Sequence, residues 1–301
     1  MSTPTIVGAG LAGLIAAHAW PSARVVEVSP EPVAAHQALL RFRSDAVARV
    51  TGIDFRRVLV RKGMWSRGEF RTPSIAHANA YESKVLSGGA LRGERSLWNL
   101  DPVERWIAPP DFHARCLANV GDRISWGKSA MLDRGDLLVS TAPMPTTLQA
   151  LHITIGGGEF FRAPIHVARF EVPNADLYQT VYFPDPELPI YRASITGSTM
   201  IVEATSGGFD ARWDSALRSA FGISVGKLLG TTEQRYGKIV PLRDSLRKPL
   251  LFDLSHRHNI FSLGRFATWR NILLDDVVQD ISVIKRLIAG NSAYDARRAS
   301  T

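Results

Sequence analysis

Three glycines near the start of the chain have the spacing of a dinucleotide-binding turn. Gly8, Gly10 and Gly13 follow the short apolar run Thr5–Val7. In such a turn the first glycine makes the bend, the second lets the backbone approach a pyrophosphate, and the third lets the following helix pack close to the strand. Glu27 lies about 20 residues beyond the first glycine, where an acid hydrogen-bonds the ribose hydroxyls. The alternative is a glycine-rich turn that binds nothing.

The elements that must position this turn are a strand, a helix and a second strand. Apolar residues continue after the third glycine and predict a helix, and residues 24–28 are typical of a buried strand. The N-terminus of that helix offers free N–H groups and the positive end of its dipole to a phosphate. Leu11 and Ala12 in the turn and Val28 after the acid complete the contacts expected here.

Two later stretches are predicted to return to the same site. The apolar run that ends at Thr141 finishes in small residues, which lets a cofactor lie across the carboxyl end of a strand. Residues 259–263 form a second such strand and lead into Gly264 and Arg265. A helix then opens at Asp275, with acids in its first turn and apolar residues at a period of about 3.6.

Composition restricts the chain to one or two globular domains with an affinity for anions. Its 301 residues are 45% hydrophobic, and its formal charge is +8. The only cysteine is Cys116, so we expect neither a disulfide framework nor a metal site. The first strand begins by residue 5 and no apolar run is long enough for a membrane span, which predicts a cytoplasmic protein without membrane contact.

The middle of the chain changes to a pattern of short strands and turns between residues 153 and 205. We therefore expect an α/β fold in which a Rossmann-like cofactor domain is interleaved with an antiparallel-sheet substrate domain. The cofactor domain is expected over 1–40, 101–150 and 238–301. The substrate domain is expected over 41–100 and 151–237.

This layout resembles the FAD-dependent flavoproteins that include the amine oxidases and UDP-galactopyranose mutase. The resemblance rests on the fingerprint 8–27, the strand 136–143 and the closing segment 264–270. It implies that the Rossmann-like domain binds FAD. A single dinucleotide fingerprint also implies that no second domain binds NAD(P)H.

The closing segment touches the FAD pyrophosphate in that family, and the resemblance gives this role to Gly264 and Arg265. It also places Leu274 and Asp275 near the pyrimidine edge of the flavin, where a helix N-terminus would stabilise the reduced, anionic ring. Residues 271–274 depart from the aromatic and acidic residues that the mutases have at this point.

Six polar residues are candidates for contact with the cofactor or the substrate. They are His36, Arg41, Arg43, Tyr191, Arg192 and Lys238. Arg41 and Arg43 share one face of an extended segment and are expected to contact cofactor or substrate phosphate; the alternative is two solvated arginines. The other four are catalytic candidates. Lys238 resembles the lysine with which amine oxidases hold a water near the flavin, although a lysine in a strand is more often a surface residue.

The resemblance favours an FAD-dependent oxidoreductase that acts at the C–N bond of an amine. One alternative is a flavoenzyme similar to UDP-galactopyranose mutase that acts on a nucleotide sugar, with its diphosphate bound by arginines. Another is a non-catalytic protein that binds flavin or nucleic acid.

Positive charge is concentrated in residues 41–71, which carry nine basic and three acidic side chains, a net +6. Such a segment predicts salt-sensitive binding to DNA. Residues 36–43 and 191–197 also resemble compact FAD proteins of bacteriophages, some of which process an amino-acid adduct on a pyrimidine during thymidine hypermodification. That resemblance implies a substrate borne on phage DNA in the host cytoplasm. The alternative is that the arginines pair with acids elsewhere in the chain.

Overall fold

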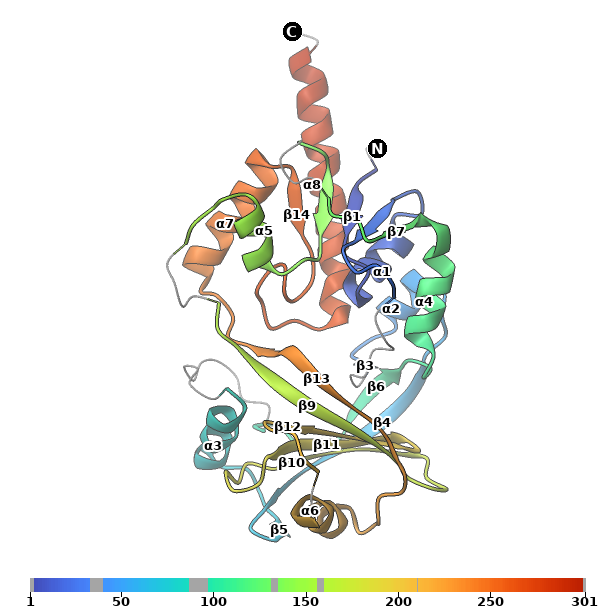
Figure 1. The fold of residues 1–301 in the computed structure, drawn as a ribbon, viewed down its shortest axis with the longest axis vertical. Coiled ribbons are helices and arrows are strands. Elements are labelled where there is room, and N and C mark those ends of the chain that lie inside the picture. Colours follow the sequence, from blue (N-terminus) through green and yellow to red (C-terminus); the bar gives the residue numbers. More distant parts are fainter. Residues whose placement is uncertain are drawn as a thin grey trace.

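The computed structural model describes residues 3–32, 40–86, 97–130, 135–155, 160–209 and 211–299. These residues form two sheets, which lie one above the other in Figure 1 with helices around them. The catalytic candidate His36 lies outside the described residues.

The smaller sheet is parallel throughout, in the order β14–β8–β1–β2–β7. Successive side chains along its strands point into two different cores. Val139 and Phe261 face one side of the sheet, and Leu138 and Ile260 face the other. Both faces are therefore covered, as a parallel sheet requires. The strands are β1 (Thr5–Val7), β2 (Val25–Glu27), β7 (Ile124–Trp126), β8 (Leu138–Ser140) and β14 (Ile260–Ser262).

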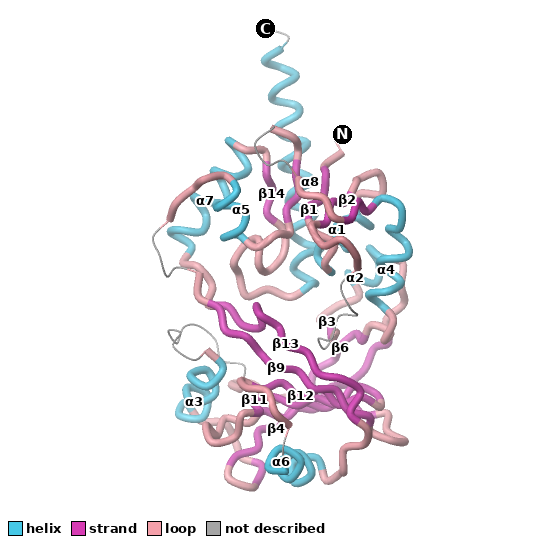
Figure 2. The backbone as a smooth tube through the Cα atoms, viewed as in Figure 1, coloured by secondary structure: helices cyan, strands magenta, loops and turns pink. Residues whose placement is uncertain are grey.

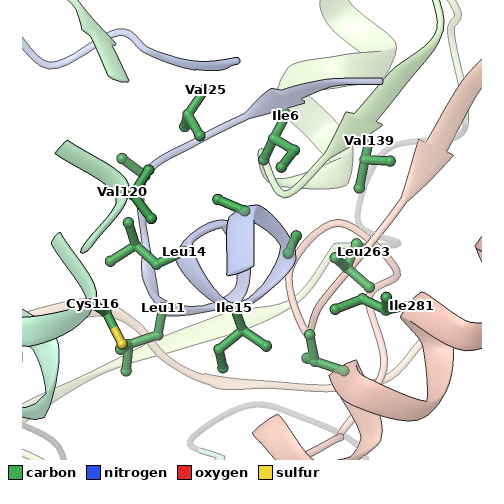
Figure 3. Close-up of a cluster of buried hydrophobic side chains, with 14 of the residues drawn as sticks. Ile6, Leu11, Leu14, Ile15, Val25, Cys116, Val120, Val139, Leu263 and Ile281 are labelled. Atoms are coloured by element: carbon green, nitrogen blue, oxygen red, sulfur yellow. The ribbon is translucent and has the colours of Figure 1, made fainter. Parts of the chain in front are cut away.

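Helix α1 lies at the centre of the core on one face of this sheet. Figure 3 shows its residues Leu14 and Ile15 among Ile6, Val139 and Ile281. Around it on this face lie α2 (Ala46–Thr51), α4 (Phe112–Val120) and α8 (Leu274–Ala299), all in contact with α1 (Leu11–Ala19). The opposite face is covered by α5 (Met144–Ala150) and α7 (Asp244–Arg257). This packing fixes the N-terminus of α1 at the edge of the sheet.

The larger sheet has nine strands, in the order β13–β9–β12–β11–β10–β4–β6–β3, with β5 paired to β4. Its pairs are antiparallel except for the parallel pair β4–β10. The strands are β3 (Arg41–Phe42), β4 (Arg56–Ser66), β5 (Glu69–Phe70), β6 (Val103–Ile107), β9 (Arg162–Glu171), β10 (Leu177–Tyr182), β11 (Ile190–Gly197), β12 (Thr199–Ala204) and β13 (Leu228–Ile239).

Two helices pack against opposite faces of the larger sheet. The face that holds Phe170, Val181 and Val202 is covered by α6 (Ala211–Phe221). The other face, with Tyr182 and Tyr191, contacts α3 (Ile75–Val85) at one end and turns toward the parallel sheet along the rest of its length. Figure 2 shows the long strands β9 and β13 rising from this sheet toward the other lobe. Residues on this second face are therefore placed between the two sheets.

The predicted α/β fold with a Rossmann-like part and an antiparallel sheet is confirmed. The antiparallel sheet includes β4, which lies in the segment 41–100 expected for the substrate domain. Strand β6 lies inside the segment 101–150 expected for the cofactor domain, yet it pairs with β3 and β4. The domain boundaries stay a prediction. Among the described residues, no helix combines the length and the apolar character needed to cross a membrane.

Candidate functional site

Three loops meet at the carboxyl edge of the parallel sheet. The backbone N–H and Oγ1 of Thr141 both donate to the Val7 carbonyl oxygen, each over 2.8 Å, which joins the loop after β8 to the end of β1. The loop after β14 reaches α1, because a Cβ added to Gly264 would lie 3.0 Å from the Cβ of Ala12. Sequence analysis predicted that these stretches share a site, and the structure brings them together.

The three glycines of the turn are required for different physical reasons. Gly8 has a φ of +98°, a conformation that side chains rarely adopt. A Cβ on Gly13 would lie 1.9 Å from the Gly8 carbonyl oxygen, so a side chain there cannot fit. A Cβ on Gly10 would meet nothing within 4 Å. The first and third glycines are thus fixed by packing, whereas the second borders open space of the kind that a pyrophosphate would fill.

The N-terminus of α1 is left without a side-chain cap. Gly10 is its N-cap and accepts the first intrahelical bond from the Leu14 N–H over 2.9 Å, but it has no side chain to accept a bond. No acid occurs in the first turn of α1. The N–H groups of Leu11, Ala12 and Gly13 therefore remain available for an anion at this helix end.

The Glu27 carboxylate is held at the end of β2 by two backbone donors. The Ala9 N–H donates to its Oε2 over 2.7 Å and the Ser29 N–H to its Oε1 over 3.0 Å. Each carboxylate oxygen keeps a lone pair for a hydroxyl donor. Val28, the next residue, is 75% exposed and lies beside this carboxylate in the chain. With the glycine turn, these groups fit the ribose and pyrophosphate of a dinucleotide.

The start of α8 is tied to the loop after β3 by its own acids. Asp275 is buried and accepts hydrogen bonds from the backbone N–H groups of Arg43 (3.1 Å) and Ser44 (2.9 Å). The Arg43 guanidinium forms an ion pair with Asp276, which also accepts from the Leu273 N–H over 2.8 Å. The side chains of Arg43 and Asp275 are thus engaged with each other's segments. Their predicted contact with a cofactor stays a prediction.

Leu274 packs against the core around α1 through its side chain. Its predicted contact with the flavin stays a prediction.

Arg41 is inserted into the larger sheet. Its guanidinium donates to Thr180 Oγ1 over 2.6 Å, to Thr196 Oγ1 over 2.8 Å and to the carbonyl oxygens of Gln179 and Ile195 over 3.2 and 2.5 Å. Burial, followed by the positive charge of Arg192, lowers its pKa to about 10. These bonds tie β3 to β10 and β11, and they leave the predicted cofactor role of Arg41 without support.

A charged cluster lies on the face of the larger sheet that turns toward the parallel sheet. Arg192 on β11 stands opposite Glu203 on β12, and their side chains form an ion pair that includes a bond of 2.6 Å from Nη2 to Oε1. The Tyr191 hydroxyl donates to the same oxygen over 3.3 Å. Burial opposes ionisation of Glu203, but Arg192 outweighs it and holds the Glu203 pKa below its usual value. The Glu203 carboxylate therefore stays charged, and both of its oxygens accept hydrogen bonds from Arg192 or Tyr191.

Lys238 joins this cluster without a bond of its own. Its Nζ lies 5.1 Å from the centre of the Tyr191 ring, and within the described residues it donates no hydrogen bond and forms no ion pair. Burial lowers its pKa to about 7, and the positive charge of Arg192 adds to that effect. At neutral pH a large fraction of this amine is therefore uncharged.

Arg265 brings the parallel sheet's closing loop to the same cluster. Its charge interacts with Tyr191, Arg192, Glu203 and Lys238. Its Nε is shielded from solvent and has no hydrogen-bond partner in the described part of the chain. Its neighbours are thus those of the larger sheet, although a contact with a cofactor pyrophosphate was predicted. That contact stays a prediction.

Glu203 is the site residue that sequence analysis missed. It was placed in a strand without a role, because an acid in an apolar strand carries no signal until its cross-strand partner is known. The register that pairs it with Arg192 follows from the hairpin β11–β12, which begins far from both residues. Of the predicted catalytic residues, Tyr191, Arg192 and Lys238 meet here.

Three acids from outside the basic segment 41–71 offset half of its net charge of +6. Three of its arginines pair with acids outside the segment, namely Arg43 with Asp276, Arg56 with Asp176 and Arg57 with Glu104. Two more pair inside it, Arg49 with Asp45 and Arg71 with Glu69. The charge surplus seen in the sequence is therefore smaller at the surface than the count of residues suggests.

A pocket of about 390 Å³ opens at the other end of the same sheet face. It is lined in part by Arg56, Tyr178, Thr196 and Ile201. Thr196 also accepts the bond from Arg41, whose pKa is affected by Arg192. Arg41 therefore lies between this pocket and the charged cluster.

Comparison with known proteins relates the chain to others by structure. No family model matches the chain, and no curated protein matches its sequence. A reduced UDP-galactopyranose mutase superposes with a TM-score of 0.62 at 14% identity, covering 96% of this chain and 94% of the mutase. A fatty acid isomerase from P. acnes gives a TM-score of 0.58 at 13% identity, covering 95% and 98%. A putrescine oxidase variant gives 0.54 at 11% identity, covering 95% and 99%.

At such low identities these matches establish the fold alone. Two of the three proteins, the mutase and the amine-oxidising putrescine oxidase, belong to the kinds of enzyme that the sequence resemblance named. The matches extend over nearly the full length of both chains, so they include the larger sheet as well as the glycine turn. The chain therefore has the architecture of this flavoenzyme group in both of its halves.

Proposed function

We propose that the protein is an FAD-dependent oxidoreductase whose substrate binds between the two sheets. The observation that carries the proposal is the position of the loop after β14: the charge of its Arg265 acts on Lys238 and the Arg192–Glu203 pair, and its Gly264 lies against α1. The structural neighbours support FAD as the cofactor. The geometry of the glycine turn and of Glu27 fits the adenosine diphosphate half of FAD.

Each part of the chain has a defined task in this proposal. The N-terminus of α1 binds the pyrophosphate and Glu27 binds the ribose. Bound FAD would supply the hydride acceptor, which this set of side chains lacks. The Arg192–Glu203 pair and the Tyr191 hydroxyl hold the floor of the site rigid, and Lys238 Nζ accepts a proton or holds a water there.

The substrate favoured by this arrangement is an amine oxidised at its C–N bond. Oxidation requires the neutral amine, and an uncharged Lys238 can accept the proton that a protonated substrate must lose. A cationic Lys238 would instead repel such a substrate. An amine carried on a modified pyrimidine of phage DNA is a narrower form of this proposal, which no comparison supports.

A second candidate is a mutase-like flavoenzyme acting on a nucleotide sugar. The cationic side chains Arg192 and Arg265 favour it, because a diphosphate needs several positive partners and Arg265 Nε has no hydrogen-bond partner among the described residues. A non-catalytic flavin- or nucleic-acid-binding protein is the third candidate.

Absorption spectroscopy of the purified full chain distinguishes these candidates. We expect a yellow protein with one FAD per chain, and a colourless protein that fails to take up FAD would remove the proposal. Bleaching of the flavin by a panel of amines without oxygen identifies an amine oxidase. Turnover of a nucleotide sugar only after prior reduction of the flavin identifies the mutase-like enzyme. Bleaching by neither, despite photoreduction, leaves the non-catalytic protein.

Binding of DNA through residues 41–71 is a separate proposal. The basic count of the segment supports it, and the ion pairs of five of its arginines count against it. Binding of labelled DNA is to be titrated at low and moderate salt with the wild type and with Arg56, Arg57, Arg61 and Lys62 neutralised together. Equal binding by both proteins, or no dependence on salt, would exclude this role.

A further inference from the structure

Lys84 and Lys238 lie on the side of the larger sheet that turns toward the parallel sheet. Burial lowers the pKa of both, but their hydrogen bonding differs. Lys84 on α3 donates to the backbone oxygens of Phe183 and Asp185 over 2.8 Å each and of Ile190 over 2.6 Å. All three protons of its ammonium are thus used to fix α3 to the sheet. Lys238 donates no hydrogen bond to any described residue, so its nitrogen is not committed to the fold.

Burial and two nearby arginines favour an uncharged Lys238 nitrogen and outweigh two carboxylates that act in the opposite direction. The ring of Tyr191 covers one side, and Arg192 and Arg265 contribute positive charge. The nearby carboxylates are Glu203 and Glu82; neither forms an ion pair with Lys238, and Glu203 is taken by Arg192 and Tyr191. A lysine that is desolvated and close to other cations is the kind that attacks carbonyl groups.

We propose that Lys238 is a covalent binding site for carbonyl compounds, with a preference for small anionic aldehydes and 2-oxo acids. The Nζ lone pair forms a bond to the carbonyl carbon, and the C=O π electrons move to the oxygen. After proton transfer from nitrogen to oxygen, water leaves and a C=N bond remains. Amine and carbonyl thus give imine and water, so no oxidant or reductant is needed.

The preference for anions comes from Arg265. Its Nε is buried without a partner in the described chain, and its charge acts on Lys238. A carboxylate on the carbonyl compound would supply the missing acceptor while the carbonyl carbon reaches Nζ. Lys238 is of intermediate exposure rather than fully buried. The inference stands on these side chains and needs neither FAD nor the proposed function.

Reductive trapping tests the inference on the full chain. Protein at pH 7 is treated with glyoxylate and cyanoborohydride, and the adducts are located by mass spectrometry of peptides. We expect Lys238 to be modified first among the seven lysines, because an ordinary surface lysine is neutral roughly a thousandfold less often at this pH. Lys84 should stay unmodified. Labelling spread over surface lysines, or an unlabelled Lys238, would overturn the proposal.

Two variants and a neutral aldehyde separate reactivity from anion preference. Lys84→Arg should label at Lys238 as the wild type does, and Lys238→Arg should lose the selective adduct. Arg265→Ala should reduce labelling by glyoxylate about tenfold more than labelling by propionaldehyde, which is the loss expected for one charge-assisted bond. Equal loss with both aldehydes would contradict the role of Arg265. A yellow protein with unreactive Lys238 refutes this inference alone, and a colourless protein with reactive Lys238 refutes the FAD proposal alone.

Discussion

The edge of the parallel sheet and the face of the larger sheet form their halves of the site in different ways. At the edge, the structure relies on what is absent: Gly13 has no side chain to meet Gly8, and the N-terminus of α1 has no cap. On the face, it relies on side chains whose charges balance across strands, with Glu203 satisfied by Arg192 and Lys238 left unsatisfied. We therefore expect added side-chain atoms to disrupt the site at the edge of the parallel sheet. Loss of a charge should disrupt the site on the face of the larger sheet.

The largest effect is expected for valine at the glycines. Gly10→Val should abolish FAD binding while the chain stays folded, because its Cβ meets no protein atom and enters the space left for the pyrophosphate. Gly13→Val should lose the fold as well, because its Cβ would lie 1.9 Å from the Gly8 carbonyl oxygen. FAD titration and thermal unfolding measure the two effects. A Gly10→Val protein that still binds FAD would show that the pyrophosphate does not pass this turn.

Loss of charge at Glu203 is the next largest effect. Glu203→Gln leaves the largely buried Arg192 guanidinium without the counter-charge of the buried Glu203, which should lower the free energy of unfolding by about 3 kcal/mol. The matched control is Glu104→Gln, which breaks the exposed pair with Arg57 and should cost less than about 1 kcal/mol. Chemical denaturation measures both. Equal costs would mean that the Arg192–Glu203 pair is as solvated as a surface pair.

The contrast between the two halves also explains what the sequence could predict. The glycine turn, Glu27 and the loops after β8 and β14 were found because they lie in local patterns of backbone geometry. Glu203 and the hydrogen bonds of Arg41 to β10 and β11 were not predicted, because they depend on the register of strands that are distant in the chain. The strand β6 was missed for the same reason, since its partners β3 and β4 precede it by a long connection.

The pH dependence of stability should report the unsatisfied Lys238. Its pKa in the folded chain is about 7, below that of an ordinary lysine, so the unfolded chain binds more protons between pH 7 and about pH 10. The free energy of unfolding should therefore rise with pH across this window, by at most about 1.4 kcal/mol per pH unit from this residue. Lys238→Met should have a shallower slope than the wild type. An unchanged slope would show that Lys238 titrates normally.

Arg265→Ala tests whether the Arg265 guanidinium contacts the cofactor or only the charged cluster on the larger sheet. Its neighbours belong to the larger sheet, so we expect FAD affinity to fall by less than about 1 kcal/mol and the pKa of Lys238 to rise, because a nearby positive charge is removed. Flavin titration and the pH profile of Lys238 labelling measure the two effects. A loss of about 1.5–3 kcal/mol in FAD binding with no change at Lys238 would instead assign Arg265 to the pyrophosphate.

The smallest effect is expected at Arg43, which the sequence predicted as a cofactor contact. Its guanidinium pairs with Asp276 at a half-exposed position, and its backbone N–H, which a substitution keeps, makes the bond to the buried Asp275. Arg43→Ala should therefore lower stability by less than about 1 kcal/mol and leave FAD affinity unchanged. The comparison variant Asp275→Asn changes the acceptor of three hydrogen bonds from residues 43 and 44 and should destabilise the chain more. If Arg43→Ala weakens FAD binding while Asp275→Asn does not, the Arg43 guanidinium contacts the cofactor. The site would then include side chains at the start of α8 as well as those on the larger sheet.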